Sequence, residues 1–88
     1  MMVVLKQFAL RKEWMKTFTV PGGNLPSWVG HWEIYDDNPT NGGKQIGSGV
    51  GPEFPREQTA LNAAIGAGVE WLLARERQML IDQYFAES

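Results

Sequence analysis

The chain of 88 residues contains no cysteine and only one histidine, His31. Without cysteine it has no disulfide bridge, no thiolate nucleophile and no cysteine-based zinc site, and a single histidine excludes a His-pair metal site. We therefore expect neither a metal ion nor a cofactor. The lack of cysteine is typical of a protein from a reducing compartment.

Long apolar runs are missing as well. No run approaches the roughly 20 residues that span a bilayer. The first six residues also lack the basic region, the apolar stretch and the cleavage site of a secretory signal. These absences predict a cytoplasmic protein that does not bind membranes.

Positive charge is in short supply, because 8 Lys and Arg against 10 Asp and Glu give a net charge of −2. The basic residues that come closest to forming a patch all lie near the N-terminus: Lys6, Arg11, Lys12 and Lys16. A nucleic-acid-binding protein usually shows a basic face or stripe. We therefore favour another partner, and keep nucleic-acid binding through this segment, with Trp14 as a stacking group, as the alternative.

The composition, 43% apolar and 20% charged, suits one globular domain over residues 1–88. Residues 1–14 are a possible N-terminal extension, with Met15 as the natural start. Residues 3–16 fit either a helix or a strand. We prefer the helix, because the apolar residues of this segment share one helical face, whereas Lys6 interrupts the alternation of a strand.

Three strands are predicted next, at Thr17–Val20, Trp28–Tyr35 and Lys44–Val50, where aromatic and β-branched residues alternate between clusters of turn formers. Gly30 interrupts the second of these strands, and Gly47 and Gly49 leave one side of the third without side chains. A strand without side chains at such positions leaves a bare surface, against which a helix or a partner can pack closely.

From Pro55 to about Phe85 the pattern predicts one helix of some 30 residues, or about 45 Å. Two apolar strips run along it. The first contains Leu61, Ile65, Gly68, Leu72 and Met79, and the second contains Ala60, Ala64, Ala67, Trp71, Ala74 and Phe85. Since a small sheet can cover only one strip, we expect the second strip to form a dimer seam or a further packing surface, and the protein to be a homodimer.

Motifs that carry chemistry are weak in this sequence. His31 and Glu33 share a strand face and could act as a base and its orienting group, but this pair alone does not predict an enzyme. The glycines of residues 47–51 are not followed by the Lys-Ser/Thr pair that ends a Walker loop. We therefore expect a non-catalytic protein.

The glycines of residues 47–51, followed by Ala60, Ala63 and Ala64, resemble the C-terminal half of a double-stranded-RNA-binding domain. That family has a Gly-rich third strand that leads into an Ala-rich helix. The resemblance implies a similar sheet-and-helix architecture but not RNA binding, because Glu57 and Gln58 stand where the family's helix begins with lysines.

Together these observations predict an α+β fold: a small antiparallel sheet of about three strands packed on one long C-terminal α-helix, preceded by an N-terminal helix or strand. The predicted function is a non-catalytic protein-binding module, such as a regulator or inhibitor that docks on a larger protein. The candidate partner-binding residues are the acidic Glu33, Asp36, Asp37 and Glu53, which would meet a basic surface.

Overall fold

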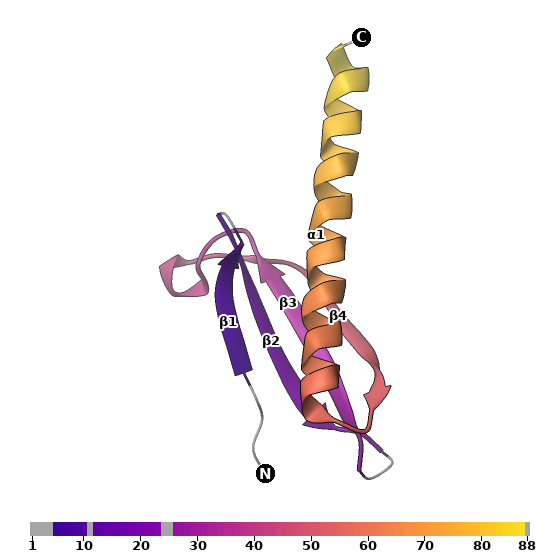
Figure 1. The fold of residues 1–88 in the computed structure, drawn as a ribbon. Coiled ribbons are helices and arrows are strands. Elements are labelled where there is room, and N and C mark those ends of the chain that lie inside the picture. The colour runs from indigo at the N-terminus through magenta and orange to yellow at the C-terminus, as the bar shows by residue number, and fades with distance from the viewer. Residues whose placement is uncertain (1–4, 11, 24–25, 88) are drawn as a thin grey trace.

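The computed structural model, which describes residues 5–10, 12–23 and 26–87, confirms the α+β class. Four strands precede one helix: β1 (Leu5–Leu10), β2 (Glu13–Pro21), β3 (Trp28–Tyr35), β4 (Gln45–Phe54) and α1 (Glu57–Glu87), with one short 3-10 turn, η1 (Pro39–Asn41), between β3 and β4. The strands form an antiparallel sheet in the order β1-β2-β3-β4, and α1 crosses one of its faces (Figure 1).

The preference for a helix over residues 3–16 was wrong. β1 and the first residues of β2 occupy the part of this segment that the structure describes, and Leu10 pairs with Glu13 at the turn between the two strands. The physical reason lies in β2, where Glu13, Met15, Thr17 and Thr19 are buried and the residues between them are half-buried. That period of two belongs to a strand with one face on a core. Residues 3 and 4 lie outside the described residues.

The three predicted strands are present, and the outer two are longer than predicted. β3 matches its predicted bounds, whereas β2 begins four residues earlier than Thr17 and β4 continues to Phe54. β1 adds a fourth strand at the edge of the sheet, beside β2.

α1 approaches the sheet at Gly30 and Gly47, whereas the ring of Trp32 in the neighbouring strand β3 fills the space beside Gly49. A Cβ atom added at Gly30 would lie 2.2 Å from the carbonyl oxygen of Ala60, and one at Gly47 would lie 2.5 Å from the ring of Trp71. The pairing of β3 with β4 also shifts register between Val29 and His31. Gly30 therefore marks both an irregularity of the strand and the closest backbone contact with the helix.

The core lies between α1 and the inner face of β2, β3 and β4. It is formed by Met15, Trp32, Ile34, Ala64 and Leu72, with Ile46, Val69 and Trp71 packed against it. The expectation that the sheet covers only one helical strip was wrong, because Ala60 of the second strip and Leu61 of the first are both buried. Close approach at the glycines lets one sheet face bury Leu61 and Leu72 of the first strip together with Ala60 and Ala64 of the second.

Beyond Leu72 the helix leaves the sheet. The sheet ends there, and the remaining turns of α1 project past it (Figure 1). We call residues 73–86 the overhang. The chain measures 54 × 26 × 16 Å and has a radius of gyration of 15.1 Å, whereas a compact chain of this length would have about 12 Å. The described residues contain no helix that combines the length and apolar composition needed to cross a membrane.

Candidate protein-binding surface

The overhang carries most of the large apolar side chains that the described residues leave in solvent. They are Leu73, Met79, Leu80, Ile81, Tyr84 and Phe85, and the only other such residue is Val50 in β4. Tyr84 and Phe85 are 70% and 68% exposed, and their rings meet edge to face with centroids 5.6 Å apart. Such a concentration of exposed apolar groups is typical of a contact surface rather than of scattered surface residues.

These residues cover several sides of the helix instead of following one stripe. At 100° per residue, Leu80 and Tyr84 lie on one side of the overhang, Ile81 and Phe85 on the next, and Met79 on the side that faces the sheet earlier in α1. The remaining side is polar and carries Gln78 and Asp82.

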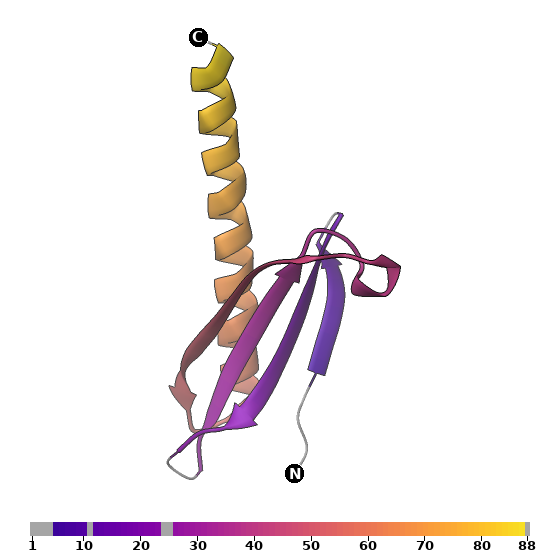
Figure 2. The same cartoon turned by 180° about the vertical axis from the view of Figure 1, so that it is seen from behind.

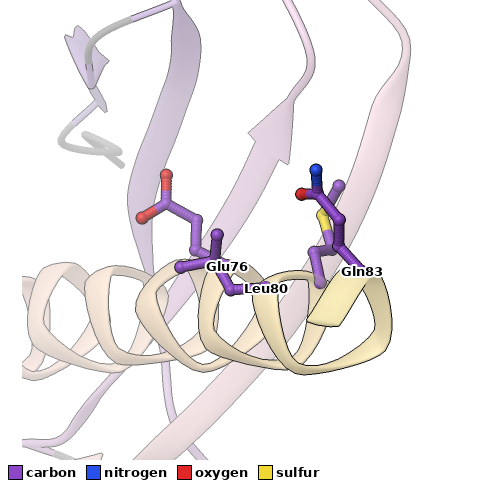
Figure 3. Close-up of a pocket in the computed structure, with 4 residues that line it drawn as sticks. Glu76, Leu80 and Gln83 are labelled. Atoms are coloured by element: carbon purple, nitrogen blue, oxygen red, sulfur yellow. The ribbon is translucent and has the colours of Figure 1, made fainter. Parts of the chain in front are cut away.

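One side of the overhang is hollowed. Glu76, Met79, Leu80 and Gln83 line a recess of about 310 Å³, and their side chains frame it from successive turns (Figure 3). These four residues have the spacing i, i+3, i+4 and i+7, and in a coiled coil four residues so spaced form the hole that receives one side chain of the facing helix. Sequence reasoning missed this recess, because Glu76 and Gln83 are polar and interrupt the apolar pattern.

The predicted dimer or packing strip divides between the sheet and the overhang. Ala60 and Ala64 are buried between α1 and the sheet, and Trp71 is half-buried with its ring 5.8 Å from that of Trp32. The other three members, Ala67, Ala74 and Phe85, are exposed. Ala60, Ala64 and Trp71 are therefore packing surface, and only the three exposed members are available to a partner.

The four acidic candidates do not form one cluster. Asp36 and Asp37 are exposed in the loop after β3, where Asp36 Oδ1 accepts a hydrogen bond of 2.7 Å from the backbone N–H of Lys44. Asp37 Oδ1 accepts a bond of the same length from the N–H of Asn38, so both carboxylates shape the loop.

Glu53 lies at the opposite end of the same pair of strands, opposite Val29. There it accepts a hydrogen bond of 2.7 Å from the N–H of Gly23. Six residues of β3 separate Val29 from Tyr35, so Glu53 and the Asp36–Asp37 loop are roughly 20 Å apart. Glu53 therefore belongs to another surface.

Glu33 lies on the outer face of the sheet, because it alternates along β3 with Trp32 and Ile34, which are buried against α1. Its Oε1 accepts a hydrogen bond of 2.8 Å from the hydroxyl of Tyr35. Partial burial, this hydrogen bond and the negative charge of Glu33 raise the pKa of Tyr35 above its ordinary value of 10.0.

The outer face is rich in aromatic groups. Phe18 and His31 stack with ring centroids 4.9 Å apart and planes 6° apart, and Trp14 lies opposite Tyr35. No described element covers this face (Figure 2). Sequence reasoning placed Trp14 in a helix, although the alternation from Glu13 to Val20 carried the signal for this face.

The two residues considered as an acid–base pair have other contacts. His31 stacks on Phe18, and Glu33 accepts a hydrogen bond from Tyr35. No group of three or more His, Cys, Asp or Glu side chains lies close enough together within the described ranges to hold a metal ion.

Comparisons of the chain with protein-family models, with curated proteins and with solved structures found no match. The partial resemblance to double-stranded-RNA-binding domains is thus not supported by a family match. In the structure Glu57 and Gln58 form the start of α1, so the first turn carries a negative charge where that family has lysines. Function has to be inferred from the overhang, the acidic loop and the outer face of the sheet.

Proposed function

We propose that this protein is a non-catalytic protein-binding module, a small regulator or inhibitor that contacts other protein through the overhang of α1. The observation that carries this proposal is the concentration of exposed apolar side chains, Leu80, Tyr84 and Phe85 above all, on helical turns that the sheet does not reach.

The apolar area is large for so small a protein. Six large side chains, each about half exposed or more, leave roughly 600 Å² of apolar surface in water. This is the upper end of what the largest patch on a typical monomer shows. At about 25 cal/mol per Å², its burial would contribute on the order of 15 kcal/mol, which can offset the cost of association.

The acidic loop supplies a second contact with a partner. Asp36 and Asp37 are exposed and follow β3 directly, and Glu33 lies two residues before Tyr35 on the same strand. A basic protein surface would complement this group, mainly by speeding encounter and excluding wrong partners. The proposal includes a cytoplasmic location, because a chain without cysteine needs no oxidising compartment.

The test is retrieval of binding proteins from the lysate of the source cells on the tagged full chain. The wild type is compared with Leu80→Asp, which places a charge in the overhang. The matched control is Asn62→Asp, which places the same charge on an exposed position of α1 beside the sheet. Each lysate is divided, and one half is treated with nuclease.

We expect a discrete protein, either a second copy of the chain or another protein, to be retained by the wild type and by Asn62→Asp in both halves. Leu80→Asp should lose it. Equal retention by Leu80→Asp, or loss of the bound protein only after nuclease treatment, would contradict the proposal.

A second candidate function is binding of single-stranded nucleic acid on the outer face of the sheet. The observation in its favour is that Trp14, Phe18 and His31 lie on one uncovered face with Lys16, and that Lys12 is exposed at the β1–β2 turn. Exposed aromatic rings can stack on bases and lysines can pair with phosphates. Titration of tryptophan fluorescence with oligonucleotides at several salt concentrations tests it, and a steep loss of affinity with salt is its expected sign.

A further inference from the structure

We propose that the overhang binds the overhang of a second copy of this chain, with the two helices antiparallel and the two-fold axis near Met79 and Leu80. This inference rests on the proposed function, since it names the partner of the surface described there.

The recess has a shape that suits a side chain of a facing helix. Its four lining residues, Glu76, Met79, Leu80 and Gln83, come from two successive turns of α1. The recess between them has the spacing that receives a side chain of a facing helix. An antiparallel copy centred between residues 79 and 80 sets each Glu76 at the level of the other chain's Gln83. The amide of Gln83 can then donate a hydrogen bond to the carboxylate of Glu76.

The charges of the overhang favour an antiparallel copy over a parallel one. Arg75 and Asp82 are seven residues apart and therefore lie on the same side of the helix. In the antiparallel arrangement, Arg75 of each chain lies within about 3 Å, measured along the axis, of the level of Asp82 in the other chain. In a parallel pair this side of the two helices would lie on opposite flanks of the contact, so Arg75 of one chain and Asp82 of the other would not meet. These charges are therefore paired only in the antiparallel arrangement.

The pair covers one side of each overhang. The contact takes in Met79 and Leu80, whereas Ile81 and Phe85 lie on the far side of the helix, so the pair buries less than about 1,200 Å² and belongs with the small interfaces. A short helix that projects alone into water is marginally stable, so a second copy would hold its turns in place.

The first test is the mass of the full chain in solution, measured by light scattering from 1 to 100 µM. We expect about twice 9.9 kDa for the wild type and for Asn62→Asp. Leu80→Asp should raise the dissociation constant at least about tenfold and give the monomer mass over most of the range. A monomeric wild type at 100 µM, or a dimer that Leu80→Asp leaves unchanged, would overturn the inference.

The second test reads the direction of the helices, and the absence of cysteine makes it simple. Leu80→Cys lies near the proposed axis, so its two copies should form a disulfide under mild oxidation. In the antiparallel pair the two copies of Leu73→Cys would be about 20 Å apart, far beyond the reach of a disulfide. Cross-linking of both variants at equal rates would mean a parallel pair and would refute the proposed direction.

Failure of this inference can be told apart from failure of the proposed function. A wild type that stays monomeric, yet binds a different protein that Leu80→Asp releases, would refute the second copy and leave the binding role in place. A monomer from which Leu80→Asp releases nothing would refute both.

Discussion

Replacing Gly30 by alanine should separate α1 from the sheet at the point where their backbones meet. The added Cβ would lie 2.2 Å from the carbonyl oxygen of Ala60 and 2.8 Å from the Cβ of Ala64. Neither neighbour is the end of a flexible side chain. The helix as a whole must therefore move by about 1 Å, because a carbon–oxygen contact needs more than 3 Å.

The expected cost is large for a domain of this size. Overpacking of a tight core typically costs 1–3 kcal/mol and sometimes more. A shift of α1 also loosens its contacts through Leu72, so we expect about 3 kcal/mol. A chain of 88 residues has roughly 4–13 kcal/mol of stability in all. The substitution should thus lower the midpoint of thermal unfolding by about 15 °C.

The assay is thermal unfolding followed by far-ultraviolet circular dichroism, at one protein concentration for all variants because association adds to apparent stability. The matched control is Gly66→Ala in the exposed part of α1, where an added Cβ meets nothing within 4 Å. Alanine is the better helix former there, so this control should gain about 0.5–1 kcal/mol.

We predict that Gly30→Ala lowers the midpoint of thermal unfolding and that Gly66→Ala raises it. If Gly30→Ala unfolds within 2 °C of the wild type, α1 does not lie as close to β3 as the structure shows. Loss of stability in Gly66→Ala would equally contradict the exposed position of that residue on the helix.

Three further predictions concern polar groups. Thr19→Val should raise the free energy of unfolding by about 1 kcal/mol in urea titration, because the buried Thr19 Oγ1 has no hydrogen-bond partner among the described residues; a loss of stability would show a partner. Because the pKa of Tyr35 is raised in the folded chain, the unfolded chain releases this proton first, and the free energy of unfolding should fall as the pH rises above about 10. Tyr35→Phe should lack this part of the fall when the free energy of unfolding is measured from pH 8 to 11. Asp36→Ala should lower the free energy of unfolding by about 1 kcal/mol, because it removes the acceptor of the hydrogen bond from Lys44, whereas Asp36→Asn keeps an acceptor oxygen. If titration calorimetry shows that both variants lose the same affinity for the partner, the lost affinity is due to the charge.

The sheet and helix of this protein were predictable where the signals agree. Over β3 the alternation, the aromatic residues and the flanking turn formers all indicate a strand, and Pro55 marks the start of α1 correctly to within two residues. Over residues 5–16 the signals conflict, because the charged Lys6 and Glu13 fall within strands. Only pairing between β1 and β2, a tertiary effect, decides that conflict.

The candidate surfaces were less predictable than the fold. Sequence distance gave no sign that Glu53 lies at the other end of the sheet from Asp36, since register and strand length set that separation. The length of about 45 Å predicted for the helix already exceeds what a small sheet can cover. The recess was not predicted, because it depends on how the side chains of Met79 and Leu80 lie beside the polar Glu76 and Gln83.

Hydrogen exchange of the backbone amides of residues 76–86 tests most directly whether protein covers the overhang. These amides belong to turns of α1 whose large apolar side chains are exposed, and a bare helical end would open readily and exchange fast. We predict slow exchange that strengthens from 1 to 100 µM protein and disappears in Leu80→Asp but not in Asn62→Asp. Fast exchange at every concentration, equal in the wild type and in Leu80→Asp, would show that no second copy covers the overhang.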